Sequence, residues 1–231
     1  MVDHRVHLDA SQQMVENEEA MKIVIIGDVH GKTNSYQKML RQKFEGVRTV
    51  QVGDMGIGFK GVGLHDQPAN HTWFRGNHDN PERCREYESY QGDYGYDTSG
   101  NFFWVAGAFS MDRDLRIEGI SWWADEELSY SELGNVIDLY EFIKPDYVLT
   151  HEAPAKAGKC LLYGLKGSYF AEKNSSTDSR TAQALQNMLD IHQPKEWVFG
   201  HYHFNHSFAV PFYNTKFTCV DELSTYELNA G

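Results

Sequence analysis

Short apolar runs, each ending in a polar side chain, constrain the fold of this sequence more than any other feature. The first run, 23–26, is β-branched and is followed by Gly27 and Asp28. Continuous apolar runs of this kind, bounded by glycine, are typical of strands buried on both faces of a sheet. The further strands predicted in this way cover 49–52, 72–75, 147–149 and 197–199.

Segments with helical spacing lie between several of these strands. Apolar residues recur at helical intervals within 33–44 and 178–192. Ser129 and Glu132 have the spacing of a capping box ahead of another helix, which Lys144 should end because a proline follows it. Strands that alternate with helices, and then give way to short hairpin-like strands, predict an α/β fold with a pair of mixed sheets covered by helices.

The remaining segments have weaker patterns. Residues 1–20 show no sustained period and are predicted to be a flexible arm, whereas 21–231 should form a single domain. We expect 81–90 to begin a helix, 92–100 to be a loop, 101–106 and 115–123 to form an antiparallel pair, 125–127 to be a solvated acidic run, and 155–176 to be a polar loop.

Potential metal ligands stand directly after the predicted strands. In an open α/β sheet, ligands bind beyond the carboxyl ends of the strands, so side chains from separate segments should meet in one crevice. Glycine before several of these residues lets the backbone turn and approach an ion closely. The expected ligands of this crevice are Asp28, His30, Asp54, Asn77, His151, His201 and His203.

These donors indicate both the type of metal and the chemistry. Carboxylate, imidazole and amide ligands suit two divalent ions such as Mn²⁺, the expected ion, with Fe or Zn as alternatives. Only Asp28 and Asp54 are anionic in this set, so the loaded site would be positive and would attract a phosphate ester. The predicted reaction is in-line attack of a metal-bound hydroxide on that ester. His78 is the expected general acid, and Asp79 is expected to orient it.

Together and in this order, the segments Gly27-Asp28-Val29-His30-Gly31, Gly53-Asp54, Gly76-Asn77-His78-Asp79, Thr150-His151 and Gly200-His201-Tyr202-His203 resemble the calcineurin-like metallophosphoesterase superfamily. The resemblance covers 21–221 and implies a four-layer αββα sandwich. It implies that Asp54 bridges two metal ions. It assigns Asp28, His30 and His203 to one ion and Asn77, His151 and His201 to the other.

The same resemblance does not determine which phosphate ester is the substrate. Related serine/threonine protein phosphatases carry an Asp-Arg-Gly after the bridging aspartate, where this chain has the uncharged segment 55–59. Two middle segments, 107–113 and 121–127, are similar to a subgroup of bacterial and phage members. Arg113, or else Arg116, could hold the phosphate instead, because guanidinium suits phosphate oxygens; Arg113 is the one predicted to bind substrate, together with Asn77 and His78.

Composition limits the partners. The formal net charge of −12 disfavours an extensive nucleic-acid surface. Three cysteines without a pattern indicate a reducing compartment, and no apolar stretch approaches the about 20 residues of a membrane span, so we expect a cytoplasmic protein. A serine/threonine-type protein phosphatase and a catalytically silent phosphate-binding module remain alternatives to a phosphatase or phosphodiesterase.

Overall fold

The computed structural model describes residues 21–65, 67–164 and 179–230. One sheet has the strand order β10-β1-β2-β3 and the other the order β4-β5-β6-β7-β9-β8. The strands of the first sheet are β1 (Met21–Ile26), β2 (Arg48–Val52), β3 (His71–Phe74) and β10 (Thr225–Ala230). Those of the second are β4 (Tyr94–Asp97), β5 (Phe102–Val105), β6 (Tyr147–Thr150), β7 (Glu196–Phe199), β8 (His206–Ala209) and β9 (Lys216–Cys219).

Both sheets are mixed. Strands β1, β2 and β3 are parallel, and β10 pairs with β1 in the antiparallel sense. In the second sheet β5, β6, β7 and β9 are parallel, while β4 and β8 form antiparallel edges. All parallel neighbours point their carboxyl ends the same way, which is the arrangement that collects ligands at one edge of a sheet.

Alternation of side chains along β1 shows how the layers are held together. Ile23 and Ile25 pack with Leu149 and Val198 of the second sheet, so one face of β1 belongs to the core between the sheets. Val24, on the opposite face, packs in a separate core cluster with residues of α1 (Thr33–Lys43). Because both faces of the strand are covered, the run is apolar throughout.

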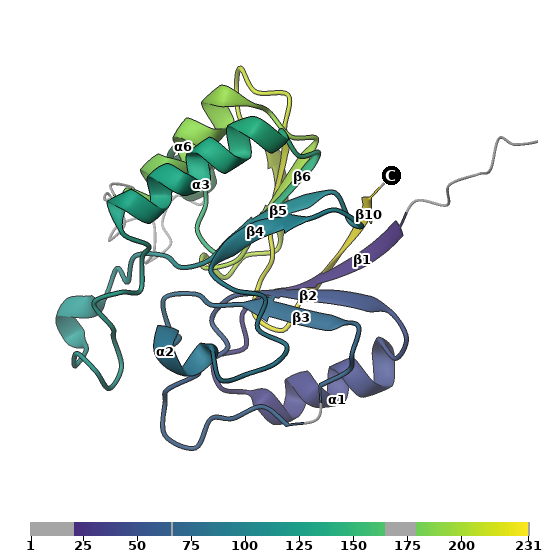
Figure 1. Ribbon diagram of the computed structural model, residues 1–231, viewed down its shortest axis with the longest axis vertical. Helices are drawn as coiled ribbons and strands as arrows, with labels where there is room; N and C mark the ends of the chain where they lie inside the picture. The colour runs from purple at the N-terminus through teal and green to yellow at the C-terminus, as the bar shows by residue number, and fades with distance from the viewer. Residues whose placement is uncertain (1–20, 66, 165–178, 231) are drawn as a thin grey trace, which may run out of the picture.

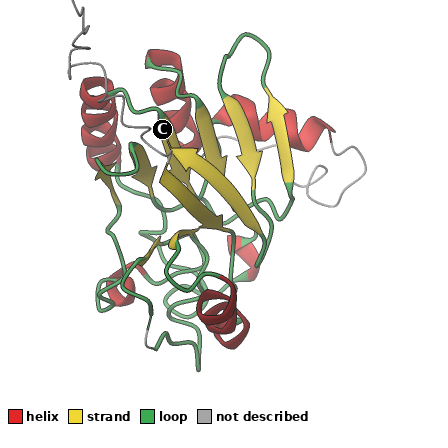
Figure 2. Ribbon diagram, turned by 90° about the vertical axis from the view of Figure 1, so that its right-hand side faces the viewer, coloured by secondary structure: helices red, strands yellow, loops and turns green. Residues whose placement is uncertain are grey.

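The second sheet is covered in the same way on its outer face. A third cluster joins Trp197 of β7 to Val136 of α3 (Tyr130–Ile143) and Leu185 of α6 (Arg180–Ile191). Figures 1 and 2 show the helices at the periphery and the strands through the middle of the molecule. The predicted four-layer αββα sandwich of two mixed sheets flanked by helices is confirmed.

Helix ends follow the local sequence signals. Ser129 and Glu132 form the predicted capping box at the start of α3, and the helix ends before Lys144, which adopts a left-handed conformation with φ of 51°. Ser179 caps α6 by accepting a hydrogen bond from the Ala182 N–H. The predicted helix at 81–90 is shorter than expected, since α2 covers only Pro81–Cys84.

The prediction of an antiparallel pair between 101–106 and 115–123 is wrong. One edge of β5 is occupied by β6 and the other by β4, which lies inside the predicted loop 92–100. No edge remains for 115–123, and this segment contains only one isolated bridge. Residues 111–123 instead project from the body with the short helix η2 (Arg113–Leu115), teal at the left of Figure 1. In this projecting segment, the side chains of Leu115, Ile117 and Ile120 are exposed.

Two further expectations change. The predicted loop 155–176 begins with helix α4 (Ala155–Gly164), and the rest of it lies outside the described residues. The acidic run 125–127 is solvated only at Asp125, because Glu126 and Glu127 are buried. Glu126 accepts a hydrogen bond from the Ser110 N–H and Glu127 one from the Thr181 N–H. The predicted arm 1–20 lies outside the described residues, and the single domain at 21–231 stays a prediction.

Candidate metal centre

The structure brings the predicted ligands together at the carboxyl ends of five parallel strands. The loops that follow β1, β2, β3, β6 and β7 each supply one or two of them. Within the described part of the chain, three groups of Asp and His side chains are close enough for each to hold an ion, and Asp54 is common to two of them. The first group is Asp28, His30 and His203, and the second is Asp54, His151 and His201. The third, His30, Asp54 and His78, shares a residue with each of them.

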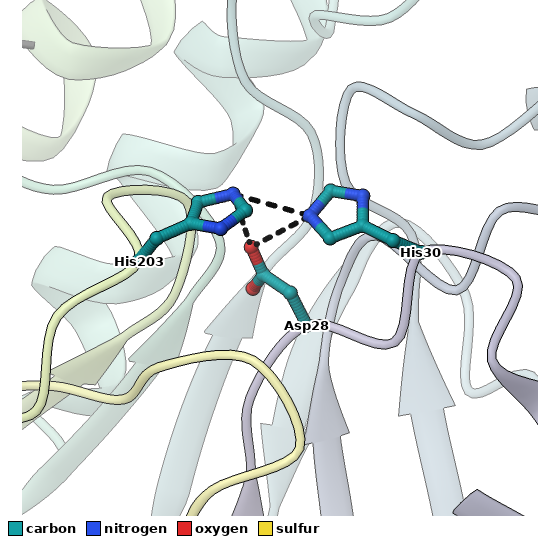
Figure 3. Close-up of side chains that lie close together, drawn as sticks. All are labelled: Asp28, His30 and His203. Carbon is teal, nitrogen blue, oxygen red and sulfur yellow. Dashed lines mark hydrogen bonds and ion pairs between the residues drawn. The ribbon is translucent and has the colours of Figure 1, made fainter. Parts of the chain in front are cut away.

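The first group joins the loop after β1 to the loop after β7. Figure 3 shows Asp28 pointing between the two imidazole rings. Its Oδ2 lies 3.5 Å from Nε2 of His30 and 3.4 Å from Nε2 of His203, and the two Nε2 atoms are 3.1 Å apart. Oδ2 of Asp28 is buried and has no hydrogen-bond partner. A buried carboxylate oxygen of this kind needs a cation to compensate for its lost hydration.

The second group joins the loops after β2, β6 and β7, and Asn77 from the loop after β3 lies against it. Nε2 of His151 lies 3.2 Å from Oδ1 of Asp54 and 3.1 Å from Oδ1 of Asn77. Two donor atoms that bind one ion at about 2.1 Å each lie about 3.4 Å apart in tetrahedral geometry. The distances in both groups match this separation, so the residues present fit divalent metal ions.

Asp54 lies between the two groups. Its Oδ1 faces His151, as above, while its Oδ2 lies 3.8 Å from Nε2 of His30. Oδ1 also accepts a hydrogen bond of 2.8 Å from the backbone N–H of His78. A carboxylate with one oxygen toward each group is the geometry of a bridging ligand, which agrees with the role that the family resemblance implies.

The backbone around the centre is strained in the way that close approach demands. His30, Asp54, His201 and His203 all have positive φ, between 47° and 68°, a region that residues other than glycine seldom adopt. Strain of this kind persists only where the surrounding structure enforces it, and it concentrates at functional sites. The glycine before Asn77 is required by space, because a Cβ on Gly76 would lie 2.6 Å from Nε2 of His151 and even closer to Oδ1 of Asp54.

The electrostatics of the centre favour positive charge. Burial acts to lower the pKa of His30 and of His151, but the Asp28 and Asp54 carboxylates outweigh it and raise these pKa values to about 9 and about 10. Burial raises the pKa of Asp54, yet the neighbouring histidines, His151 first, hold it well below its usual range. The buried carboxylates therefore attract cations, whether protons or metal ions.

Hydrogen bonds to neighbouring groups fix the orientation of the ligands. Nδ1 of His151 donates to the Val52 carbonyl at 2.8 Å, so Nε2 is the ring nitrogen that faces the centre. Nδ2 of Asn77 donates to Oγ of Ser110 at 3.0 Å, so Oδ1 of Asn77 is the atom that faces His151. Ser110 is held in turn by Glu126 through its N–H.

A buried carboxylate lies behind His201. Oε2 of Glu152 is 3.8 Å from Nε2 of His201, and Oε1 accepts a hydrogen bond of 2.6 Å from the Tyr202 hydroxyl. Ser110, Glu126 and Glu152 are supporting residues that were not predicted from the sequence. Glu152 carries a signal, since it directly follows the predicted ligand His151, whereas no local pattern marks Ser110 or Glu126.

His78 lies at the rim of the centre, with 19% of its side chain exposed and Nε2 3.8 Å from Oδ2 of Asp54. Burial, with a further contribution from Arg116, lowers its pKa to about 4, although Asp54 acts in the opposite direction. The ring contacts Arg116, whose Nη1 and Nη2 are each 3.0 Å from a ring nitrogen. Arg116 therefore lies in the site, as one of the two arginines considered from the sequence.

Asp79 and Arg113 occupy other positions than the sequence predicted. Both carboxylate oxygens of Asp79 accept backbone N–H groups, from Gly76 and from residues 55–57, so Asp79 shapes the loop after Asp54 instead of orienting His78. The guanidinium of Arg113 lies over the rings of Phe109, at 4.5 Å, and Trp122, at 5.7 Å. The two arginines are separated by a tight turn, and only Arg116 turns toward His78.

Comparison with known proteins supports the family that the motifs suggest. The structure described as "GAP50 the anchor in the inner membrane complex of Plasmodium" has a TM-score of 0.45 and 11% sequence identity, and the match covers 90% of this chain and 78% of that chain. A likeness of this degree is too weak to indicate function. Comparison with curated proteins gives no match. The family model for the calcineurin-like phosphoesterases matches residues 21–205. The chain therefore belongs to the calcineurin-like phosphoesterase family.

Proposed function

We propose that this chain hydrolyses phosphate esters at a centre of two divalent metal ions, with Mn²⁺ as the expected ion and Fe or Zn as alternatives. The observation that carries the proposal is the position of Asp54, which turns one carboxylate oxygen toward each of two ligand groups. Two ions held by such a bridge supply Lewis acidity and an activated water near neutral pH.

The protein residues have separate roles in this proposal. Asp28, His30 and His203 would hold one ion; Asn77, His151 and His201 would hold the other; Asp54 would contact both. Their supporting hydrogen bonds keep the donor atoms aimed inward, so little reorganisation is needed when substrate binds.

His78 is the residue that we assign to the leaving group. Its ring is partly exposed at the rim of the centre, where a substrate can reach it. With its lowered pKa the ring is neutral in the free protein and carries one N–H. We propose that this N–H is directed to the leaving oxygen, on which negative charge develops as the ester bond breaks.

Other features favour this function over a serine/threonine-type protein phosphatase. The segment after Asp54 carries no arginine, and its backbone N–H groups are bound by the buried Asp79.

Other properties of the chain bear on its substrate and location. The net charge of −12 supports a phosphate-ester substrate over an extended nucleic acid. Cys84, Cys160 and Cys219 are free, which supports a reducing, cytoplasmic location. Among the described residues, no helix has the length and apolarity needed to cross a membrane.

The proposal is tested by stripping the protein of metal, reloading it with Mn²⁺, Fe²⁺ or Zn²⁺, and assaying p-nitrophenyl phosphate and bis-p-nitrophenyl phosphate side by side. We expect metal-dependent hydrolysis that Asp54→Asn abolishes and His78→Ala reduces by roughly 10²- to 10⁴-fold. Calorimetry should show two ions bound per chain. If phosphate binds but neither ester is hydrolysed with any of the three metals, the chain is a phosphate-binding module and the proposal fails.

A further inference from the structure

We propose that Arg116 binds the phosphoryl oxygens of the substrate, and that the substrate is accordingly a phosphomonoester. The inference rests on the proposed hydrolysis and names the substrate class of the same site. Arg116 belongs to the projecting segment 111–123, outside the two sheets, and 15% of its side chain is exposed.

The guanidinium of Arg116 is fixed on two of its three edges by its own segment. Nε and Nη2 donate to the two carboxylate oxygens of Asp112, at 2.6 and 2.8 Å. Nη1 donates to the Ser121 carbonyl at 3.0 Å. These contacts hold the guanidinium plane in one orientation. The remaining edge, with one N–H each on Nη1 and Nη2, faces His78 at the rim of the metal centre.

In the free protein this edge contacts the imidazole of His78, which cannot accept hydrogen bonds from both N–H groups. Nη1 and Nη2 lie 3.0 Å from Nδ1 and Nε2 of His78, respectively. A neutral imidazole has only one acceptor nitrogen, so it cannot satisfy two donors. Two oxygens of a phosphoryl group can satisfy both, in the parallel geometry that makes arginine a strong phosphate ligand. The arrangement is therefore better suited to a phosphate than to the histidine that it contacts.

The number of oxygens then distinguishes monoesters from diesters. A monoester has three non-bridging oxygens and up to two negative charges, whereas a diester has two oxygens and one charge. A guanidinium that acts beside a cationic centre gains most from the ester with the additional anionic oxygen. Arg116 should therefore matter much more for monoesters than for diesters, and His78, released from the guanidinium, becomes available to the leaving group.

The test compares Arg116→Met and Arg116→Lys with wild type after reloading with Mn²⁺. Each protein is assayed with p-nitrophenyl phosphate and with bis-p-nitrophenyl phosphate, and the binding of inorganic phosphate is measured by calorimetry. We expect Arg116→Met to lower kcat/KM for the monoester, and to weaken phosphate binding, by roughly 10- to 150-fold. Hydrolysis of the diester should stay close to wild type, and Arg116→Lys should lie between the two.

Control variants separate this role from a structural one. Arg41→Met removes an exposed arginine of α1 and should match wild type in every assay. Asp112→Asn keeps Arg116 but weakens the contact that orients its guanidinium. It should therefore lower kcat/KM for the monoester selectively, but by a smaller factor than Arg116→Met. Metal content and circular dichroism confirm that each variant is loaded and folded. Should Arg116→Met prove unfolded, Arg116→Lys and Asp112→Asn still test the ratio of monoester to diester activity.

The outcomes distinguish this inference from the proposed function. Equal losses for both esters, or a monoester loss in Arg113→Met in place of Arg116→Met, would overturn the assignment of Arg116 while hydrolysis stands. If wild type hydrolyses neither ester but binds phosphate through Arg116, the hydrolytic function fails and the phosphate contact is supported. Phosphate binding that does not change in Arg116→Met would overturn the contact itself.

Discussion

The buried ion pair of Arg75 and Asp93 is expected to contribute strongly to the free energy of unfolding. Arg75 follows β3 directly and its side chain is 2% exposed. Its Nε donates to Oδ1 of Asp93 at 2.5 Å and its Nη1 to the Glu126 carbonyl at 2.6 Å. Asp93→Asn is nearly isosteric, but it leaves the guanidinium buried without a counter-charge. We expect it to lower the free energy of unfolding by about 3–5 kcal/mol.

A second arginine that binds Asp93 supplies a matched control. Arg85 donates to Oδ2 of the same carboxylate at 2.7 Å, but 55% of its side chain is exposed. Arg85→Met should therefore lower the free energy of unfolding by only about 0–1 kcal/mol. In a protein of this size, the expected loss in Asp93→Asn corresponds to a decrease in Tm of roughly 6–20 °C.

The assay is urea and thermal unfolding followed by circular dichroism, with Arg75→Met and the double variant completing a cycle. Removing both charges should be less destabilising than Asp93→Asn alone, since no buried charge is then left unpaired. Although burial acts in the opposite direction, Arg75 holds the pKa of Asp93 below its usual value. The stabilisation is thus present above the unfolded pKa and is lost as pH falls through the lowered folded pKa. A loss in Asp93→Asn no larger than that in Arg85→Met would refute the reasoning.

Three further predictions concern the centre and the core. Gly76→Ala should fold but bind metal poorly, because its Cβ would lie on Asp54 and His151; metal content by atomic spectroscopy checks this. Glu126→Ala should weaken metal binding by roughly 10- to 100-fold, since it removes the acceptor that holds the Ser110 N–H and, through Ser110, positions Asn77; titration with Mn²⁺ tests this, and unchanged affinity would contradict it. Burial lowers the pKa of His71 to about 3, so the unfolded chain binds one more proton between that pH and about 6.5. As pH decreases from about 6.5 towards about 3, the free energy of unfolding should therefore decrease by up to about 1.4 kcal/mol per pH unit. His71→Gln, compared with wild type by urea unfolding at several pH values, should lack this part of the pH dependence.

Local sequence predicted the parts of the fold that depend on local physics. The apolar run of β1 is buried on both faces because helices and a second sheet cover it. The capping box at Ser129 formed as predicted, because its two hydrogen bonds join residues three positions apart. The candidate ligands could be predicted because each lies in the loop that follows a strand, and parallel strands place their carboxyl ends at one edge.

Residues that act through distant contacts were not predictable in this way. Glu126 belongs to an acidic run that looks solvated, yet it is buried because Ser110 lies beside it in the folded chain. Asp79 follows His78 in sequence, but its carboxylate turns to the backbone after Asp54. Sequence proximity gave the wrong partner in that case, because the side chain follows the available N–H donors.

The sequence by itself predicted the buried strands β1, β2, β3, β6 and β7 and the candidate ligands that follow them, since apolar runs mark the strands and polar residues stand at their carboxyl ends. The family resemblance, and not the apolar pattern, implied the four-layer sandwich. Only the tertiary structure decided which edge of β5 each strand occupies, and which of Arg113 and Arg116 faces the centre. Strand pairing depends on which of several segments, far apart in the chain, occupies each edge. The edge of β5 predicted for residues 115–123 is occupied by β4. The direction of an arginine within a projecting loop depends on where the loop folds back, which no local pattern encodes.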